Sequence, residues 1–565
     1  MFETLGEALK EISLAKNKGI YIVRNDGTEK YIKYDELYER ASGILYNLQK
    51  NGIKEKDKVI FQIKENEDFI TIFWACILGN IIPVPITVGA NDEHKLKLYK
   101  IFNLFDSAFI IIDEDSSDRI ISYGEKKGLN EIALNIKERT IFINDLKIIT
   151  GKGKSAEAKS DDIAFIQFSS GSTGDPKGVI LTHENLIYDT VYYNKKIHVT
   201  SKDIAVSWLP LTHDMGLIVV HIASLISGID QLIIPTTLFV RNPTIWMKQV
   251  TQKKATITYS PNFGYKYFLK FYNRQKNNGK INSWDLSTLR YILNGAEPIS
   301  SKILDEYYKE MYQYGLKKDI IHGGYGLAEG TVAVSLQEPH EKLATISLDR
   351  NSLGIGQIVK EIGLDSTESV TFVDEGYPIE CCKVRICDED NKVLDQNTVG
   401  HIQIKGNNVT RGYYNNEKAT REIMTEDDWL ITGDIGFLRD NKVFIIGRYK
   451  DIIFVNGSNY YAHDIERIAE EVEGIELGNI VAHGIYNDNL QEEEIILFII
   501  NRKSQEEFAE IAIKVKKYIN RVAGIKISKV VPVRKIPKTT SGKVQRYALS
   551  QKYKNGEFKS IEEVI

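Results

Sequence analysis

The sequence predicts an α/β protein: a large N-terminal domain of layered α/β subdomains with a small β-rich subdomain, followed by a small α+β C-terminal domain. Three observations support this fold class. Apolar runs of strand length alternate with helical patterns in the first part of the chain, shorter strand-like pieces follow beyond about Gly376, and helices alternate with strands again after Asp451. Such alternation is typical of α/β layers with largely parallel, buried strands.

The first strands are expected at four apolar runs. These are KVIFQI at Lys58, AFIII at Ala108, IAFIQF at Ile163 and QLIIP at Gln231. The long apolar stretch that starts at Phe69, FITIFWACILGNIIPVPITVGA, contains glycine, asparagine and two prolines. Because proline and glycine break helices, this stretch predicts a buried helix, a turn and a short strand, and no membrane span.

The later elements define the domain limits. The pieces KVRICDEDNKVL, GHIQIKGNNV and KVFIIGRYKDIIF are separated by Asn, Asp and Gly turns, which predicts a β-rich subdomain over about 376–447. Helical patterns around DIERIAEEVE and EEFAEIAIKVKKYINRV alternate with strand-like EIILFII and KVVPV. We therefore expect a large domain over 1–447 and a C-terminal α+β domain over 451–565.

Composition and charge exclude several classes of protein. The chain has 565 residues, 27% of them charged, and a net charge of −4, which excludes a disordered chain, a collagen and a coiled coil and gives no case for binding nucleic acid. Residues 501–565 are unusual, because 16 Lys or Arg against 6 Asp or Glu give them a net charge of +10. Four cysteines without a CxxC pair and the lack of a secretory signal pattern predict a cytoplasmic protein.

The segment Ser169–Gly178 predicts a phosphate-binding loop between a buried strand and a short strand that leads into a helix. Its glycines let backbone N–H groups approach an anion, and its hydroxyls and one lysine add further donors. These residues are Ser170, Gly171, Ser172, Thr173, Gly174, Lys177 and Gly178. The loop is not a Walker loop, because Pro176 precedes the lysine and Gly178 follows it. A flexible surface loop would explain the same composition when the segment is taken alone.

At this point the sequence resembles a known superfamily. SSGSTGDPKG is similar to the signature loop of the adenylate-forming enzymes, which include acyl-CoA synthetases, peptide-synthetase adenylation domains and firefly luciferase. Further motifs follow in the order found in that superfamily: NGAEP at Asn294, GGYGLAE at Gly323, TGD at Thr432, GRYKDIIFVNGSN at Gly447 and PKTTSGKVQR at Pro537. The resemblance covers nearly the whole chain.

This resemblance implies a site for ATP and magnesium. The phosphate loop would bind ATP, Tyr325 would stack on the base, and Glu329, with Thr173, would hold magnesium. Asp434 and Arg448 match residues that bind the ribose hydroxyls, although each alone could be a surface residue. The remaining nucleotide-binding positions are Gly295, Ala296, Glu297, Gly324 and Gly326.

The resemblance also implies a mobile C-terminal domain that carries the catalytic lysine. Lys543, in TSGKVQR, occupies that lysine's position. A lysine aimed at the α-phosphate stabilises the negative charge that grows there when a carboxylate attacks. Lys450, within 448–450, occupies the hinge position about which the small domain would rotate.

Several segments resemble one branch, the fatty acyl-AMP ligases. WLPLTHDMGL is similar to the signature of that branch and predicts an acyl pocket near His213, Asp214, Met215 and Gly216. The stretch from Leu343 to Glu375 resembles an insertion of that branch. The branch implies that a fatty acid is converted to acyl-AMP and passed to the phosphopantetheine thiol of an acyl carrier protein. No carrier motif occurs in this chain, so the carrier protein would be a separate polypeptide.

Other functions remain open on the sequence alone. A long-chain acyl-CoA synthetase would differ only in the thiol that accepts the acyl group, and an amino-acid-activating domain is more distant. A catalytically inactive scaffold relative is the alternative from another class, although the residues that it would lose are present. The chain also departs from the branch at Ser458, Tyr460 and Ala462, where Arg, His and Pro are usual.

Overall fold

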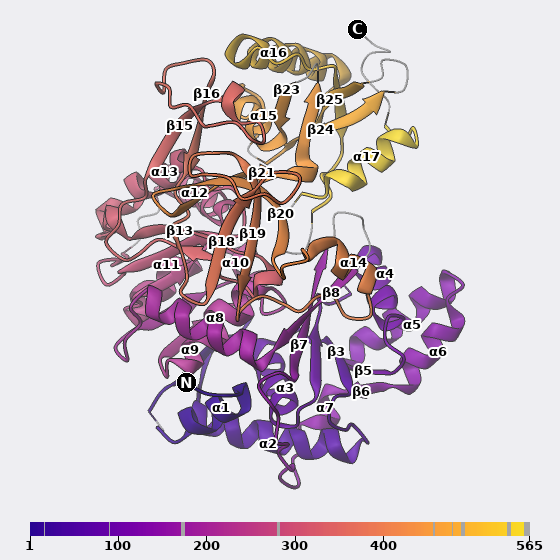
Figure 1. The fold of residues 1–565 in the computed structure, drawn as a ribbon. Coiled ribbons are helices and arrows are strands. Elements are labelled where there is room, and N and C mark those ends of the chain that lie inside the picture. The colour runs from indigo at the N-terminus through magenta and orange to yellow at the C-terminus, as the bar shows by residue number, and fades with distance from the viewer. Residues whose placement is uncertain are drawn as a thin grey trace.

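The computed structural model describes residues 1–15, 17–89, 91–170, 176–279, 283–455, 458–476, 478–487, 492–538 and 544–558. Figure 1 shows the C-terminal elements, in orange and yellow, stacked above the rest of the chain. This α/β architecture confirms the predicted fold class.

The largest sheet has nine strands. Their order is β17 (Tyr377–Pro378), β14 (Ser335–Leu336), β13 (Ile321–Tyr325), β12 (Tyr291–Gly295), β11 (Ile257–Tyr259), β9 (Ile204–Ser207), β10 (Asp230–Ile233), β1 (Gly19–Val23) and β2 (Glu29–Lys33). The strands from β13 to β1 are parallel, and β2, β14 and β17 pair antiparallel at the edges. The central strands are buried, as expected for a sheet with helices on both faces.

Two smaller sheets complete the first part of the chain. One is parallel, in the order β4 (Ile82–Pro85), β3 (Lys58–Gln62), β5 (Ala108–Ile112) and β6 (Thr140–Phe142). The other pairs β7 (Ile163–Ser170) with β8 (Pro176–Thr182), and it is antiparallel. This pairing departs from the parallel pattern because a connection as short as 171–175 allows a hairpin, whereas a parallel crossover needs about a dozen residues or more.

Helices cover these sheets. They are α1 (Leu5–Ser13), α2 (Tyr34–Lys50), α3 (Asn66–Leu78), α4 (Asp92–Phe102), α5 (Glu114–Lys126), α6 (Asn130–Glu138), α7 (Ile143–Leu146), α8 (His183–Lys196), α9 (Ala223–Ile226), α10 (Thr236–Arg241), α11 (Ile245–Lys253), α12 (Asn262–Asn277) and α13 (Ser301–Met311). Helix α3 is buried from Phe69 to Leu78, and a turn and β4 follow it, as predicted. In the part of the chain that the structure describes, no helix is long and apolar enough to span a membrane.

The β-rich part contains two antiparallel sheets. A hairpin joins β15 (Thr345–Asp349) to β16 (Ser369–Val373), within the predicted insertion. A four-stranded sheet follows, in the order β18 (Cys382–Cys387), β19 (Gly400–Gly406), β20 (Leu430–Arg439) and β21 (Lys442–Arg448), with α14 (Glu417–Ile423) beside it. All four cysteines of the chain are buried thiols without disulfides.

The C-terminal part has its own apolar core. Its elements are β22 (Ile452–Val455), β23 (Ser458–Tyr461), α15 (Ala462–Ala469), β24 (Ile480–Asn487), β25 (Glu492–Ile500), α16 (Gln505–Ala523), β26 (Lys529–Val533) and α17 (Arg546–Lys554). The side chains of Ile465, Leu497 and Val515 are fully buried in this core. Ser504 and Glu507 form a capping box at the start of α16. A separate core fits the expected C-terminal domain, whose limits stay a prediction.

Candidate active site

The candidate site lies at the carboxyl ends of β12 and β13, the edge at which open parallel sheets bind ligands. The two strands are register partners, with Asn294 opposite Gly323 and Gly295 opposite Gly324. A Cβ atom at Gly295 would lie 2.5 Å from the Gly324 carbonyl oxygen, so glycine permits this close backbone approach. Ala296 follows with a left-handed backbone, φ 72°, which is uncommon without glycine.

Two glycines of the GGYGLAE motif are required by packing. A Cβ at Gly326 would lie only 1.6 Å from the Val332 carbonyl oxygen, and one at Gly324 would lie 2.7 Å from Leu336 Cδ2. Larger residues at either position would therefore displace the turn after β13. This turn holds Tyr325 at the strand end.

Tyr325, Asp434 and Arg448 meet although they are far apart in the sequence. The Tyr325 hydroxyl donates to Asp434 Oδ2 at 2.7 Å, and Arg448 Nε lies 3.1 Å from Asp434 Oδ1. Asp434 and Arg448 are also opposite each other in β20 and β21. Burial and the neighbouring Asp434 raise the pKa of the Tyr325 phenol, and Asp434 raises the pKa of Arg448. The structure thus brings together the residue expected to stack on the base and the two expected to bind the ribose.

Glu329 and Lys177 lie on either side of Tyr413. The Tyr413 hydroxyl donates to Glu329 Oε1 at 2.7 Å, while Lys177 Nζ lies 5.0 Å from the centre of the Tyr413 ring. Burial, followed by the nearby Glu329 charge, raises the pKa of the Tyr413 phenol. Sequence reasoning missed Tyr413, because nothing in the RGYYN segment distinguishes a site tyrosine from a core tyrosine. A carboxylate oxygen of Glu329 is the ligand type that magnesium prefers.

The predicted acyl-pocket residues lie at the start of a π-helix, Met215–Ile222. His213 Nδ1 and the Met215 backbone N–H both lie 2.6 Å from Asp214 Oδ1. A Cβ at Gly216 would lie 2.3 Å from the Pro210 carbonyl oxygen, so glycine is required where the helix begins. Gln167 Nε2, in β7, donates to the Thr212 carbonyl at 3.2 Å. This contact ties the segment to the strand that leads into the phosphate loop, and its role in acyl binding stays a prediction.

Other predicted residues are distributed as follows. Glu297 Oε1 accepts from the Phe263 backbone N–H, which anchors the NGAEP motif to α12. Gly178 has no left-handed backbone; it sits in β8, where a Cβ would press against Ile166 and Phe168. Lys450 is exposed in a 3₁₀ turn, Tyr449–Asp451, that joins β21 to β22.

Part of the predicted site lies outside the described residues. These positions are Gly171, Ser172, Thr173, Gly174 and Lys543, and the side chain of Ser170. Within the described residues, no three His, Cys, Asp or Glu side chains form a group that could hold a metal ion. Magnesium binding by Glu329, together with Thr173 outside the described residues, stays a prediction.

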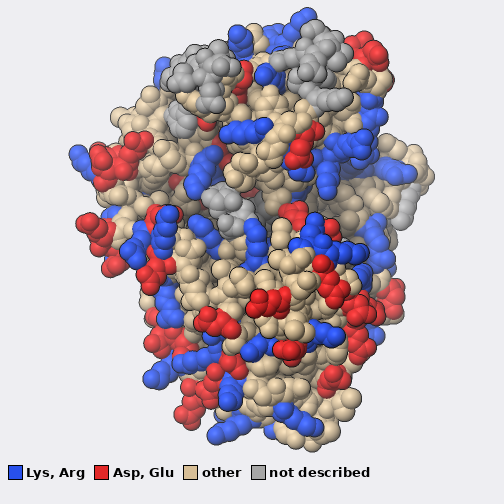
Figure 2. Space-filling view, turned by 90° about the vertical axis from the view of Figure 1, so that its right-hand side faces the viewer, with Lys and Arg blue, Asp and Glu red and all other residues tan. Residues whose placement is uncertain are grey.

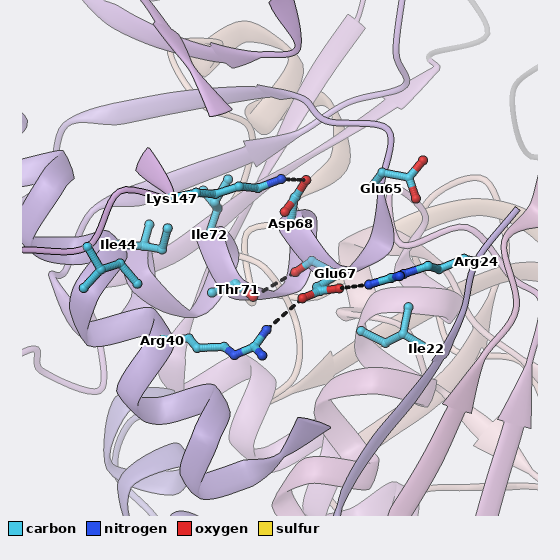
Figure 3. A pocket seen from close by; sticks show the side chains of 11 residues that line it. Ile22, Arg24, Arg40, Ile44, Glu65, Glu67, Asp68, Thr71, Ile72 and Lys147 are labelled. Carbon is cyan, nitrogen blue, oxygen red and sulfur yellow. Dashed lines mark hydrogen bonds and ion pairs between the residues drawn. The ribbon is translucent and has the colours of Figure 1, made fainter. Parts of the chain in front are cut away.

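Figure 3 shows a cavity of about 570 Å³ that belongs to another region, between β1 and helices α2 and α3. Two of its three carboxylates are already paired: Glu67 lies 2.7 Å from Arg40, and Asp68 lies 2.7 Å from Lys147. Because these charges neutralise one another, we assign no function to this cavity.

Comparison with known proteins identifies the family. The model for the AMP-binding enzyme family matches residues 13–414. JamA, the medium-chain-fatty-acid–[acyl-carrier-protein] ligase of Moorena producens (strain JHB), is 29% identical over 543 residues, 93% of this chain and 90% of JamA. A Caulobacter vibrioides protein, provisionally named an acyl-CoA synthetase, is 28% identical over 567 residues, 99% of this chain and 96% of that protein.

A solved structure extends the likeness to the whole fold. It comes from structural and functional studies of fatty acyl-adenylate ligases from E. coli and L. pneumophila, and it is 27% identical in sequence. It matches with a TM-score of 0.88 over 98% of this chain and 98% of its own. The matched family model, the ordered motifs and the shared fold agree: the chain belongs to the AMP-binding enzyme family.

Proposed function

We propose that this protein is a fatty acyl-AMP ligase that loads a separate acyl carrier protein. In the first half-reaction, a fatty-acid carboxylate oxygen attacks the α-phosphorus of ATP, the bond between the α- and β-phosphates breaks, and pyrophosphate leaves. In the second, the phosphopantetheine thiolate of the carrier attacks the acyl carbonyl carbon, and AMP leaves.

The arrangement of Tyr325, Asp434 and Arg448 carries the proposal. Asp434 has two carboxylate oxygens to accept hydrogen bonds from ribose hydroxyls, and Arg448 holds it in place from the neighbouring strand. The Tyr325 ring, fixed by its bond to Asp434, gives a base a flat surface. Together they would orient a nucleotide at the end of the sheet.

Glu329 and Lys177 would act on the phosphates. Magnesium on Glu329 would neutralise charge on the phosphate oxygens as pyrophosphate forms. Lys177, in the predicted phosphate loop, would add positive charge near the phosphates. Lys543 would stabilise the transition state from the C-terminal domain, after rotation about Lys450.

Two observations support a carrier protein over coenzyme A as the acceptor. The relative from Moorena producens is named as an acyl-carrier-protein ligase, and the stretch from Leu343 to Glu375, which resembles the insertion of acyl-AMP ligases, forms the antiparallel pair β15–β16. The relative from Caulobacter vibrioides, by its name, favours the alternative of an acyl-CoA synthetase. Since these two enzymes share the first half-reaction, only the acceptor distinguishes them.

Charge supports the carrier protein as well. Figure 2 shows Lys and Arg side chains above and below the border between the C-terminal part and the rest, on the side where α4 and α17 lie. Helix α4 carries Lys95, Lys97 and Lys100, and α17 carries Lys552 and Lys554. Such a surface would steer an acidic, phosphorylated partner by electrostatic complementarity. Buried thiols without disulfides fit a cytoplasmic site for this reaction.

The decisive experiment measures pyrophosphate release with ATP, magnesium and a panel of fatty acids, followed by mass spectrometry of the acyl product. We expect acyl-adenylate whose acyl group moves to a holo carrier protein and poorly to coenzyme A. Rapid acyl-CoA formation would instead make the protein an acyl-CoA synthetase. No adenylate with any acid would favour the scaffold alternative.

Ionic strength should change the rates of the two half-reactions to different extents. If the basic surface recruits the carrier, added salt should slow transfer to the carrier far more than pyrophosphate release, because screening weakens interactions between exposed charges. Equal slowing of both steps would contradict the role of the basic surface.

A further inference from the structure

Four buried side chains form one chain of hydrogen bonds in the interior of the large N-terminal part. Trp74 Nε1, in α3, donates to His221 Nε2 at 2.8 Å, and His221 Nδ1 lies 3.0 Å from Gln231 Oε1, in β10. Gln231 Nε2 donates to the hydroxyl of Tyr34, in α2, at 2.9 Å, and this hydroxyl donates to the Ile229 carbonyl at 2.8 Å. Each of the four side chains belongs to a residue that is at most 1% exposed. The chain therefore joins α2, α3 and β10 to the π-helix that contains His221.

The partners of His221 determine which of its ring nitrogens carries the proton. An indole N–H can only donate, so His221 Nε2 accepts from Trp74, and Nδ1 carries the proton that it donates to Gln231. The second N–H of the Gln231 amide donates to the His221 backbone carbonyl at 3.2 Å, which orients the amide as well. Burial lowers the pKa of His221 to about 4, so the ring is neutral at physiological pH. Every side-chain donor in this chain of bonds therefore has an acceptor.

His221 lies in the π-helix Met215–Ile222, which begins at the predicted acyl pocket. All eight residues of this helix are buried, and the N–H of Ala223, directly after it, donates to the Ile218 carbonyl five residues before. π-helices are rare, usually limited to a single turn, and frequent at functional sites. Because an i→i+5 turn contains more residues than an α-helical turn, relaxation to an α-helix would rotate the first turn of this segment about the helix axis.

His221 is the only polar side chain within the π-helix, whose sequence is MGLIVVHI. The backbone before and after the helix has other anchors, since Gln167 Nε2 donates to the Thr212 carbonyl and Asn194 Nδ2 donates to the Ala223 carbonyl at 2.8 Å. The remaining side chains of the helix contribute apolar packing, which is not directional. The hydrogen bonds of His221 are therefore the side-chain contacts that can fix how the helix is rotated.

We propose that His221, with its partners Trp74 and Gln231, is a positioning residue for fatty-acid binding: the buried chain of hydrogen bonds fixes the rotation of the π-helix and so sets the place of His213 and Asp214 in the acyl pocket. This inference rests on the proposed function, because that function makes the segment an acyl pocket. It gives a role to three buried residues that lie outside the motifs resembling the adenylate-forming enzymes.

The proposal predicts an effect on the fatty acid without an equal effect on the nucleotide. The four side chains of the chain of bonds belong to α2, α3, the π-helix and β10. The residues that we expect to bind the base and the ribose, Tyr325, Asp434 and Arg448, belong to β13, β20 and β21. Loss of the hydrogen bonds of His221 should therefore weaken binding of the acyl group and leave nucleotide binding nearly unchanged.

The test measures binding of AMP and of three acyl-sulfamoyl adenosines, stable mimics of acyl-AMP with octanoyl, dodecanoyl and hexadecanoyl chains, by isothermal titration calorimetry. For the wild-type protein, we expect the best of the three to bind on the order of 100-fold more tightly than AMP, because burial of methylene groups favours binding. His221→Leu removes both ring nitrogens and should lower this ratio roughly tenfold or more, the scale for a displaced binding group. In turnover, KM for the fatty acid should rise in this variant, while KM for ATP stays within about threefold.

Three further variants separate positioning from general loss of packing. His221→Gln retains an acceptor and a donor, so it should keep most of the wild-type ratio. Trp74→Phe keeps an aromatic ring and removes the donor to His221, so it should lower the ratio as His221→Leu does. Tyr99→Phe is its matched control, because it also keeps a ring and loses one buried bond, to the Ile120 carbonyl between α4 and α5. Equal losses in Trp74→Phe and Tyr99→Phe would mean that the core is merely loosened, and the proposal would be wrong.

The wild-type protein and the variants fail in different ways if the ideas are wrong. Wild-type protein that binds all three acyl compounds no better than AMP would contradict the proposed function, and this inference with it. Wild-type protein that prefers an acyl compound, together with an unchanged ratio in His221→Leu, would overturn this inference alone. If His221→Leu does not fold, the ratio measured for Trp74→Phe decides between the same two outcomes.

Discussion

The interior of the large N-terminal part and its border with the C-terminal part are stabilised in different ways. One continuous apolar core, which includes Phe73, Trp246 and Ile404, runs through residues 5–443. At the border, three ion pairs among the described residues link the two parts, one of them partly buried and two exposed: Lys266–Glu470, Lys270–Glu476 and Lys302–Glu471. Close packing makes the first region rigid, whereas exposed ion pairs contribute little each and separate easily.

One border contact differs from these three. Arg350, in the insertion, lies 2.9 Å from Asp464 in α15, and both side chains are buried. Nearby, the Tyr461 hydroxyl donates to the Leu353 carbonyl at 2.7 Å. Ile452 and Tyr461 of the C-terminal part are also buried in an apolar cluster with Leu348 and Phe437. Among the described residues, the C-terminal part therefore joins the rest through one buried patch beside β15 and β16 and through ion pairs elsewhere, whereas the large part is packed throughout. A rotating C-terminal domain requires a border of this kind.

Breaking the buried border pair should have the largest effect. Removing one partner of a buried ion pair costs about 3–5 kcal/mol, and since Asp464 keeps a 3.0 Å contact with Arg467, we expect Arg350→Met to lower the free energy of unfolding by about 3 kcal/mol. Urea denaturation measures this change in the free energy of unfolding. Arg421→Met, which removes an exposed pair with Glu417, is the matched control and should cost about 0.5 kcal/mol or less. Equal costs in the two variants would contradict the contrast between buried and exposed contacts.

The second largest effect follows from the proposed roles of the two parts, with nucleotide binding in the large part and Lys543 in the C-terminal part. Lys543→Ala should lower acyl-adenylate formation by on the order of 10²-fold or more, the scale for removing a donor that stabilises transition-state charge. AMP binding should persist, because the base and ribose contacts that we propose come from the other part. Pyrophosphate release and calorimetry measure the two quantities.

Lys535→Ala, at an exposed position of the same domain, serves as the control for that variant and should adenylate normally. Wild-type adenylation by Lys543→Ala would remove this lysine from the mechanism.

A smaller effect should follow from a single hydrogen bond in the preformed half. Tyr325→Phe keeps the ring but loses the 2.7 Å bond to Asp434, and a bond to a charged group contributes about 1.5 kcal/mol or more. We expect AMP to bind roughly tenfold more weakly. Tyr99→Phe loses a buried bond to the Ile120 carbonyl, between α4 and α5, so it should leave AMP affinity unchanged. Unaltered AMP binding in Tyr325→Phe would mean that Asp434 is held without the phenol.

Much of this fold follows from local sequence patterns. The apolar run from Phe69 indicated helix, turn and strand, because its glycine and prolines fall between two buried segments. The sequence patterns also predicted the alternating helices and strands of the C-terminal part. The antiparallel pairing of β7 with β8 was not, because the buried face of a strand does not reveal its partner.

The residues of the candidate site also include some that the sequence predicts and some that it does not. Motif residues such as Asp434 and Arg448 were found because the segments that carry them resemble known ones, and the structure brings them together. Tyr413, which contacts Glu329, was missed, because its position depends on packing between segments distant in sequence. The depth of an acyl pocket depends on such packing too, so chain length could not be predicted.

The exposed border pairs should show the smallest effect, and they test whether the border is truly weak. Lys270 lies 2.9 Å from Glu476, and both side chains are largely exposed. Water screens their attraction and both side chains lose freedom on pairing, so Lys270→Ala should change the free energy of unfolding by about 0.5 kcal/mol or less. Raising the salt concentration should shrink that difference further. A loss comparable with that of Arg350→Met, in the same urea titration, would show that the border is held as firmly as the core, and a C-terminal domain that rotates between the two half-reactions would then be hard to sustain.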